Sequence, residues 1–319
     1  MFNLPWHRDL GYNGDLGYNG GNGAAKAKVP ARPTLDRFMN AQTATAKAAA
    51  ASPELILLRE DLTGAHSGIA ILTLNRAAAR NSLSEALLEA LSDALTAIAH
   101  DGTVRVVVLA ANGPAFSAGH DLKELNAHRK DEDRGRSYFK HIMGLCSGVM
   151  QQIVALPQPV IAAVGATATA AGCQLVASCD LAVAADTAKF ATPGVNIGLF
   201  CSTPMVALSR NVSRKAAMEM LLTGEMISAK EAARIGLVNH VVAPGHERDE
   251  AIKLARKITA KSAVTVKIGK EGFYRQLEMP LAEAYDYVSG VMVENLLVRD
   301  AEEGISAFIE KREPKWEDR

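Results

Sequence analysis

The chain has no net charge, no apolar segment at its start and no cysteine or histidine cluster. Lysine plus arginine number 35, as do aspartate plus glutamate, so no overall electrostatic field favours nucleic acid or an anionic membrane as a partner. Residues 1–23 lack the continuous apolar run of a secretory signal. No cysteines form a CxxC pair and no histidines have the spacing of metal ligands, so no metal site is expected. Any anionic ligand must therefore be bound by a few local groups.

The cysteines and one long uncharged segment are best explained by a buried core. Four buried thiols in a reducing compartment are expected for Cys146, Cys173, Cys179 and Cys201. Between residues 141 and 179 there is no Asp, Glu, Lys or Arg, which raises the question of a membrane span. Two adjacent glutamines at 151–152 and a Pro-Gln-Pro sequence at 157–159 interrupt this segment, and a bilayer tolerates such groups badly. We interpret it as core and expect no membrane partner.

The first 53 residues differ in composition from the rest. The sequence DLGYNG at residues 9–14 is repeated at residues 15–20, and an alanine-rich run follows at 44–51. Such a segment buries little apolar surface, so residues 1–53 are predicted to be a disordered or loosely attached arm. A mitochondrial presequence is the weaker alternative, because Asp9 and Asp15 are acidic. The expected location is therefore cytoplasmic, with the mitochondrial matrix as the alternative.

From residue 54 onward, strand and helix patterns alternate. Helical spacing of leucines predicts a helix over 84–99 with Ser84 as its N-cap, and a second helix is predicted over 136–154. Strands are predicted at 54–59, 69–75, 104–110, 160–164, 181–185 and 238–242. The alternation favours an α/β core over 54–250, followed by a helical region over 251–319. The apolar side of the last helix, 300–311, is suited to packing or to a subunit interface.

Two glycine-containing loops follow predicted strands. AFSAGHDL covers residues 115–122, and GATATAAGCQ covers residues 165–174 and leads into a helix. Small residues let backbone N–H groups approach a ligand, and a helix N-terminus favours developing negative charge. Each loop taken alone is better explained as a structural turn, because glycine is common at strand ends. Two such N–H groups aimed at one point would form an oxyanion hole.

The order of several motifs identifies a resemblance. From about residue 55 to the end, the chain resembles the crotonase (enoyl-CoA hydratase/isomerase) superfamily. AFSAGHDLKEL at 115–125 is similar to its FxxGxDLKE stretch, AAGCQLVASCDLAVA at 170–184 to its GGGCELAxxCDxxxA stretch, and EGISAFIEKR at 303–312 continues the match. The resemblance implies a crotonase fold, a spiral core of ββα repeats with a C-terminal helical trimerisation region. It also implies a homotrimer or a hexamer built as a dimer of trimers.

The same resemblance implies where an acyl-CoA thioester would bind. The thioester oxygen would be held by two backbone N–H groups, which fall on His120 and Ala171. No separate cofactor is expected, because coenzyme A is part of the substrate. The family's coenzyme A contacts, two of them from a neighbouring subunit, would fall on Ala118, Asp121, Leu122, Phe308 and Lys311. Arg80 would serve the phosphates, because Ala78 stands where the family often has a lysine; for Arg80 and Lys311 the alternative is a solvated surface charge.

The acidic groups of the family's hydratases are missing. Its two water-activating glutamates fall on Gln174 and Gly194, and the aspartate of related isomerases falls on Asn196. None of the three can take a proton at neutral pH. The resemblance therefore implies a lyase of the enoyl-CoA hydratase type whose hydration activity is weak. The alternatives are a non-catalytic acyl-CoA binder or regulator, or another crotonase-type reaction: isomerase, thioester hydrolase or decarboxylase.

Four ionisable residues remain near the expected site: His120, Asp121, Cys173 and Cys201. His120 stands where the family commonly has Ala or Ser. Asp121 is expected to fix its loop rather than transfer protons. Cys173 is interpreted as a packing residue rather than a nucleophile.

Overall fold

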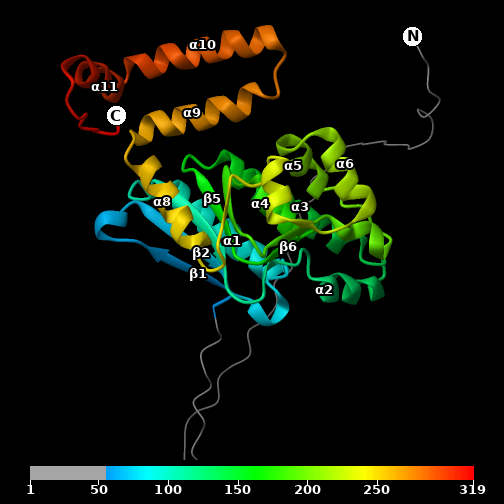
Figure 1. Ribbon diagram of the computed structural model, residues 1–319. Helices are drawn as coiled ribbons and strands as arrows, with labels where there is room; N and C mark the ends of the chain where they lie inside the picture. The colour runs from blue at the N-terminus through cyan, green and yellow to red at the C-terminus, as the bar shows by residue number, and fades with distance from the viewer. Residues whose placement is uncertain (1–54) are drawn as a thin grey trace, which may run out of the picture. The chain divides into compact units, whose positions relative to one another are not determined.

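The computed structural model describes residues 55–319 (Figure 1). The predicted N-terminal arm and its DLGYNG repeat therefore lie outside the described residues. Within residues 55–319 no helix is both long and apolar enough to cross a membrane.

The larger of two sheets has six strands in the order β1-β2-β3-β5-β7-β10. Its strands are β1 Leu57–Asp61, β2 Ile69–Leu74, β3 Val106–Ala111, β5 Val160–Val164, β7 Leu181–Ala185 and β10 His240–Val242. Only the β1–β2 pair is antiparallel. β2 and β5 are buried along their whole length, which explains why their sequences are apolar at consecutive positions rather than at alternate ones.

The smaller sheet has the order β4-β6-β8-β9. Its strands are β4 Ala115–Ser117, β6 Thr167–Thr169, β8 Lys189–Ala191 and β9 Ile227–Ser228. The pairs β3/β4, β5/β6 and β7/β8 each send their first strand to the larger sheet and their second to the smaller one. This arrangement confirms the predicted spiral of repeats.

Helices cover both faces of the larger sheet. On one face a core forms with α1 Glu85–Ala99, α3 Arg136–Ala155 and α4 Ala171–Ser178. On the other face, α8 Glu247–Thr259 buries two alanines against β2, β3, β5 and β7. α1 confirms its prediction, since its five apolar positions at 87, 88, 91, 95 and 98 are buried and the Ser84 side chain accepts the Leu87 N–H at 3.2 Å.

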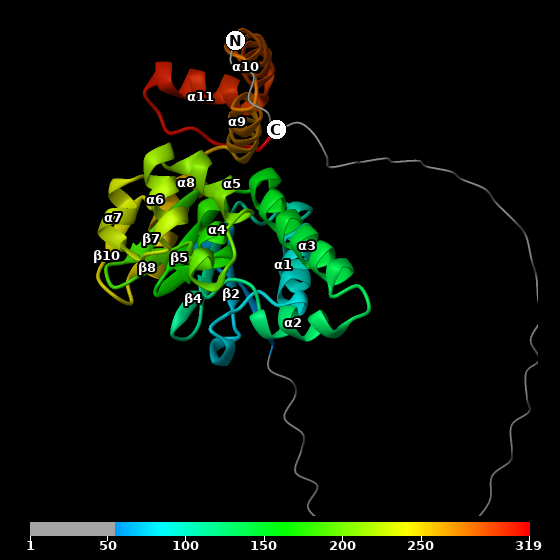
Figure 2. The ribbon, with the colours of Figure 1, turned by 90° about the vertical axis from the view of Figure 1, so that its right-hand side faces the viewer.

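The remaining helices lie around the smaller sheet and at the C-terminal end. Short helices α2 Leu122–Ala127, α5 Pro204–Asn211, α6 Arg214–Thr223 and α7 Ala229–Arg234 complete the core. Figures 1 and 2 show α9 Ala263–Gln276, α10 Leu281–Leu297 and α11 Arg299–Glu310 grouped apart from the sheets. The predicted boundary at residue 250 falls inside α8, which packs on the sheet, so the separate helical group begins with α9.

α9 is attached to the core by a buried cation. The Lys270 ammonium donates to the Ile153 and Gln158 carbonyls at 3.0 Å each and to Asp180 at 2.8 Å. Burial lowers the pKa of Lys270, while Asp180 opposes that shift. The Tyr274 hydroxyl donates to the other Asp180 oxygen at 2.9 Å. One carboxylate thus fixes two successive turns of α9 to the end of the larger sheet.

Candidate functional site

The two glycine loops lie side by side because their strands pair. β4 and β6 are parallel, with Ser117 opposite Ala168, so the chain leaves both strands at the same edge of the sheet. Gly119 has φ +90°, and a Cβ there would lie 2.9 Å from Ala170 Cβ. A Cβ at Gly172 would lie only 2.3 Å from the Ser117 carbonyl oxygen. The close approach of the loops therefore requires glycine at both positions.

This approach brings together the two backbone N–H groups predicted from the sequence. A Cβ placed on Gly119 would lie 3.3 Å from the Ala171 nitrogen. His120 directly follows Gly119, so its N–H also lies in this region. Neither the His120 N–H nor the Ala171 N–H has an acceptor among residues 55–319. Ala171 is the first residue of α4, where the helix dipole favours a negative charge. That these two N–H groups form an oxyanion hole stays a prediction.

The backbone around His120 is fixed by a segment ahead of α1. The Leu83 N–H donates to Gly119 O at 2.8 Å, and the Asp121 N–H donates to Leu83 O at 3.2 Å. These two bonds lie on either side of His120 and leave its own N–H free of backbone partners in the described chain. The position of this donor is therefore set before any ligand binds.

Three buried polar atoms near the loops have no hydrogen-bond partner in the described part of the chain: His120 Nε2, Gln174 Oε1 and Thr192 Oγ1. The Gln174 N–H donates to Ala170 O at 3.0 Å, which places Gln174 one helical turn from Ala170. The Ala170 N–H donates to the Ala191 carbonyl at 2.9 Å, and Thr192 directly follows Ala191. Buried polar atoms without partners are uncommon, and these three belong to segments that the backbone hydrogen bonds and strand pairing bring close to the two loops.

The His120 imidazole is largely buried. Burial lowers its pKa below the ordinary value of about 6.5. The ring is therefore mostly neutral at pH 7 and can accept a proton there.

Gly194 lies under a turn of its own chain. It belongs to the 3-10 helix Pro193–Ile197, and its N–H donates to Cys201 Sγ at 3.3 Å. A Cβ at Gly194 would lie 2.9 Å from Leu199 O and 3.0 Å from Cys201 Sγ. Residues 199–201 thus fill the space that a side chain at this position would enter.

Asn196 is exposed at the end of the same short helix. Its Nδ2 lies 3.0 Å from the position that a Cβ would take at Gly224, the C-cap of α6. The amide therefore packs against the end of α6.

Burial keeps the thiols of the site protonated. All four cysteines are buried, as the sequence predicts. Burial, with a smaller effect of Cys201, raises the pKa of Cys173 to about 12, and burial raises the pKa of Cys201 as well. A thiolate nucleophile is therefore disfavoured at neutral pH, in agreement with a packing role for Cys173.

Asp121 fixes the loop that carries His120. Its carboxylate accepts the Lys123 N–H at 3.1 Å as the N-cap of α2, the Ser82 hydroxyl at 3.0 Å and the Arg76 guanidinium at 3.2 Å. Burial alone would raise its pKa, but these hydrogen bonds together lower it. Asp121 is ionised and fully engaged, as expected of a structural carboxylate.

The other predicted coenzyme A residues lie at the surface. The Ala118 N–H donates to Arg80 O at 3.0 Å, so the backbone at Arg80 supports the loop. The Arg80 side chain is exposed and forms no ion pair with the described residues. Leu122 is half-exposed at 52%, while Phe308 is 85% exposed on α11 and Lys311 is the exposed C-cap of that helix.

The sequence analysis did not single out Asn81, which supports the start of the 115–122 loop. Asn81 is fully buried with φ +50°, and its side chain donates to the Asn112 and Ala115 carbonyls at 2.8 Å each. It also accepts the Arg76 N–H at 2.8 Å. An asparagine in a loop is the one available signal, because this residue tolerates the left-handed region.

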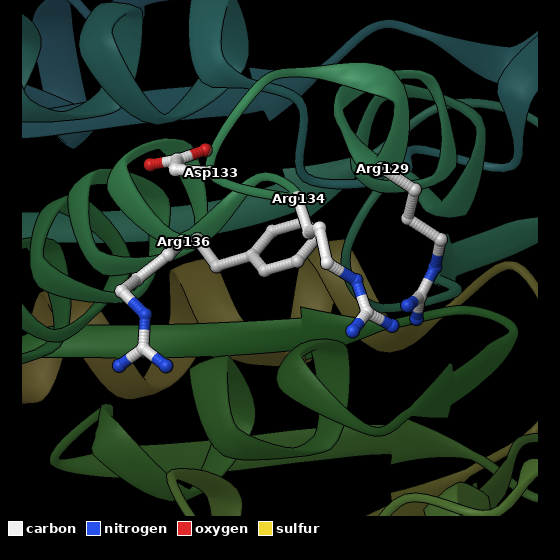
Figure 3. A pocket seen from close by; sticks show the side chains of 5 residues that line it. Arg129, Asp133, Arg134 and Arg136 are labelled. Atoms are coloured by element: carbon white, nitrogen blue, oxygen red, sulfur yellow. The ribbon is translucent and has the colours of Figure 1, made fainter.

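A separate cavity of about 340 Å³ lies at the start of α3, lined by Arg129, Asp133, Arg134, Arg136 and Phe139 (Figure 3). Its three guanidinium groups form no ion pair with residues 55–319, and the Asp133 carboxylate instead accepts the Gly135 and Ser137 N–H groups. None of the predicted site residues lines this cavity. Among the described residues no group of His, Cys, Asp and Glu side chains could hold a metal ion.

Comparison with known proteins identifies the family. A profile of the family described as "Enoyl-CoA hydratase/isomerase" matches residues 64–319. The human protein "Enoyl-CoA hydratase domain-containing protein 3, mitochondrial" is 50% identical over 249 residues, covering 78% of this chain and 80% of that protein. A "Probable enoyl-CoA hydratase" of Rhizobium meliloti is 34% identical, covering 79% of this chain and 95% of that protein.

Two solved structures are similar along nearly their whole length. An enoyl-CoA hydratase of Mycobacterium smegmatis superposes with a TM-score of 0.77 at 52% identity, covering 82% of this chain and 99% of that one. The crystal structure of human enoyl-CoA hydratase domain-containing protein 3 gives 0.77 at 48% identity, covering 82% and 100%. The described fold and these similarities together show that this chain belongs to the enoyl-CoA hydratase/isomerase (crotonase) family.

Proposed function

We propose that this protein binds an acyl-CoA thioester with its carbonyl oxygen between the His120 and Ala171 N–H groups. The observation that carries the proposal is the pair of backbone donors without acceptors in the described chain, at the start of α4. Two preorganised donors stabilise an oxygen that gains negative charge, as in an enolate or a tetrahedral intermediate. Membership of the crotonase family supports the thioester as the ligand class.

The nominal reaction is hydration of a 2-enoyl-CoA, and we propose that it is slow. Related proteins carry the name enoyl-CoA hydratase. Gln174, Gly194 and Asn196 are neutral, however, and one positioned acid or base is typically worth about 10²–10⁴ in rate. Crotonyl-CoA should therefore bind well and turn over far more slowly than in an enzyme with two glutamates.

A second candidate is a non-catalytic acyl-CoA binder or regulator. The packing at Gly194 favours this candidate, because residues 199–201 close that position and it offers no acid or base. Isomerase, thioester hydrolase and decarboxylase reactions are the further alternatives. The two candidates share the ligand and differ in whether the bound thioester is converted to a product.

Binding is tested by calorimetric titration with coenzyme A, butyryl-CoA and crotonyl-CoA, and hydration by the loss of enoyl absorbance. Ala170→Gly is the matched control, because Ala170 has φ +50° and glycine adopts this conformation freely. In the Ala170→Gly background, Ala171→Pro removes one N–H at the first helical position, where proline is tolerated. We expect the double variant to lose about 10²–10³ in any turnover relative to its control. Absence of binding by the wild-type protein would refute the proposal.

We propose a homotrimer or a dimer of trimers, with α10 and α11 at the interfaces. Large apolar side chains are exposed on these two helices: Leu281, Tyr285, Met292, Val293, Leu296, Leu297, Ile305, Phe308 and Ile309. Exposed apolar surface of this extent marks an interaction site. In such an assembly, Phe308 and Lys311 would reach the coenzyme A bound by a neighbouring subunit.

For location, the mitochondrial alternative is now preferred to the cytoplasmic expectation. The human, rat and mouse relatives are all named as mitochondrial proteins. Fractionation of cells expressing the full chain tests this assignment, and recovery in the cytosolic fraction alone would contradict it.

A further inference from the structure

We infer that the imidazole of His120 is the acid–base group of this site, and that it removes a proton from the carbon next to the thioester carbonyl. The inference rests on the proposed binding of an acyl-CoA thioester. It assigns the side chain of His120 a role separate from that of its backbone N–H.

The location of the imidazole depends on the residue that carries it. The ring is attached to the residue whose N–H would hold the thioester oxygen. Its Nε2 is buried and has no partner among residues 55–319. Buried imidazole nitrogens are normally hydrogen-bonded, so the missing partner of this atom calls for a functional explanation.

Among the site residues, His120 alone combines a free side chain with a useful proton affinity. Gln174, Thr192 and Gly194 carry no titratable group, and burial raises the pKa values of Cys173 and Cys201. The other ionisable candidate, the Asp121 carboxylate, is paired with Arg76.

The charged groups on the neighbouring elements either have hydrogen-bond partners of their own or do not shift the pKa of His120. On α2, Glu124 accepts the Glu85 N–H at 3.1 Å, and on α1 the Glu85 carboxylate contacts His141 at 2.9 Å. Lys123 is exposed on α2, and α4 carries no charged side chain. Burial is the only cause of the lowered His120 pKa, so the ring is neutral at pH 7, which is the form in which a base must start.

A single acid–base group suffices for a proton shift but not for the addition of water. Nε2 takes the proton from the α-carbon, and the C–H electron pair moves to form an enolate whose oxygen is held by the two N–H groups. The imidazolium then returns the proton to the α-carbon, or to the γ-carbon of a 3-enoyl thioester to give the conjugated 2-enoyl thioester. One group serves both steps. Hydration needs a further group to hold and deprotonate water, and Gln174 and Gly194 do not supply one.

Deuterium exchange tests the inference directly. Butyryl-CoA is incubated with the protein in D₂O, and loss of the α-proton signal is followed by NMR; conversion of 3-hexenoyl-CoA to the 2-enoyl product is followed by absorbance. His120→Ala and His120→Gln both keep the backbone N–H, and the glutamine variant also keeps a polar side chain. We expect each to lose about 10²–10⁴ of the exchange rate, with butyryl-CoA affinity changed only a few-fold.

His100→Ala is the matched control. His100 is the C-cap of α1, and this 15-residue helix places it about 22 Å from the end that contacts the site. It should exchange at the wild-type rate. Because burial lowers the pKa of His120, the wild-type rate should rise with pH through a midpoint below the ordinary imidazole value of about 6.5 and become constant above it, since only the neutral imidazole accepts a proton. The glutamine variant should lack this dependence.

The outcomes separate the inference from the proposed function. Binding of butyryl-CoA without α-exchange by the wild-type protein would overturn the inference and leave the binding proposal intact. Wild-type exchange rates in a folded His120→Ala or His120→Gln variant, checked by thermal unfolding, would also overturn it. Failure to bind butyryl-CoA would overturn both.

Discussion

The sequence resemblance places Gln174 and Gly194 at the positions expected for the two glutamates of the family's hydratases, and the surroundings of these two residues differ. Gln174 is 4% exposed, and its Oε1 has no partner in the described chain, so a carboxylate of the same shape fits there. Gly194 has backbone and sulfur atoms against the position of its missing Cβ. A glutamate can therefore replace Gln174 without new space, whereas a glutamate at Gly194 requires the neighbouring atoms to move.

We predict that Gln174→Glu raises crotonyl-CoA hydration by about 10²-fold, the lower end of the range for one positioned base. Gln174→Glu with Gly194→Glu should raise it further than either change alone, because both groups act on one water molecule. Loss of enoyl absorbance measures all four proteins. Fast hydration by the wild-type protein would show that another group already supplies the base.

Gly194→Glu alone should lower the free energy of unfolding by about 1–3 kcal/mol, the usual cost of overpacking a well-filled site. In a Cys201→Ala background the cost should be smaller, because the sulfur 3.0 Å from the new Cβ is removed. Urea unfolding of both variants and of Cys201→Ala alone gives the comparison. An equal cost in both backgrounds would assign the strain to Leu199 O instead.

At the scale of elements, α11 is held by a buried carboxylate. Glu303 accepts two hydrogen bonds from the Arg312 guanidinium, at 2.6 and 2.9 Å, and one from the Lys315 N–H at 2.8 Å. The bonds from Arg312 and Lys315 lower the pKa of Glu303 to about 2. They connect the segment after the helix to the helix itself.

The sign of the pH dependence follows from this depressed pKa. In the unfolded chain Glu303 titrates near 4.3, so its contribution to stability is complete above that pH and is lost as the pH falls toward 2. We predict that the protection of the amides of residues 312–319 against hydrogen exchange, relative to the intrinsic rate at each pH, falls over this interval. Glu303→Gln should show fast exchange at pH 7 already, and unchanged exchange in that variant would contradict the assignment.

At the scale of the whole molecule, the exposed apolar surface of α10 and α11 predicts an assembly. Phe308→Asp should dissociate the oligomer, because a charge would be buried at the interface. Sedimentation should show smaller particles and titration should show weaker coenzyme A binding. Glu313→Gln, at an exposed position after the helix, is the control and should leave both unchanged. A monomeric wild-type protein at micromolar concentration would contradict the prediction.

The sequence by itself determined the fold class, the cap and apolar face of α1, and the two glycine-containing loops. These features depend on periodicity, capping and short motifs, which involve residues close together in the chain. That Gln174, Gly194 and Asn196 carry no carboxylate was equally visible, because it is a matter of residue type alone.

Only the tertiary structure decided what surrounds those residues. Asp121 is paired with Arg76, Gly194 is covered by residues 199–201, and Asn196 packs against α6. It also decided that His120 Nε2 is buried without a partner. The physical reason is that burial and pairing depend on chain segments brought together by the pairing of β4 with β6 and by the packing of α4 against both. No local pattern at His120 or Gly194 encodes these contacts.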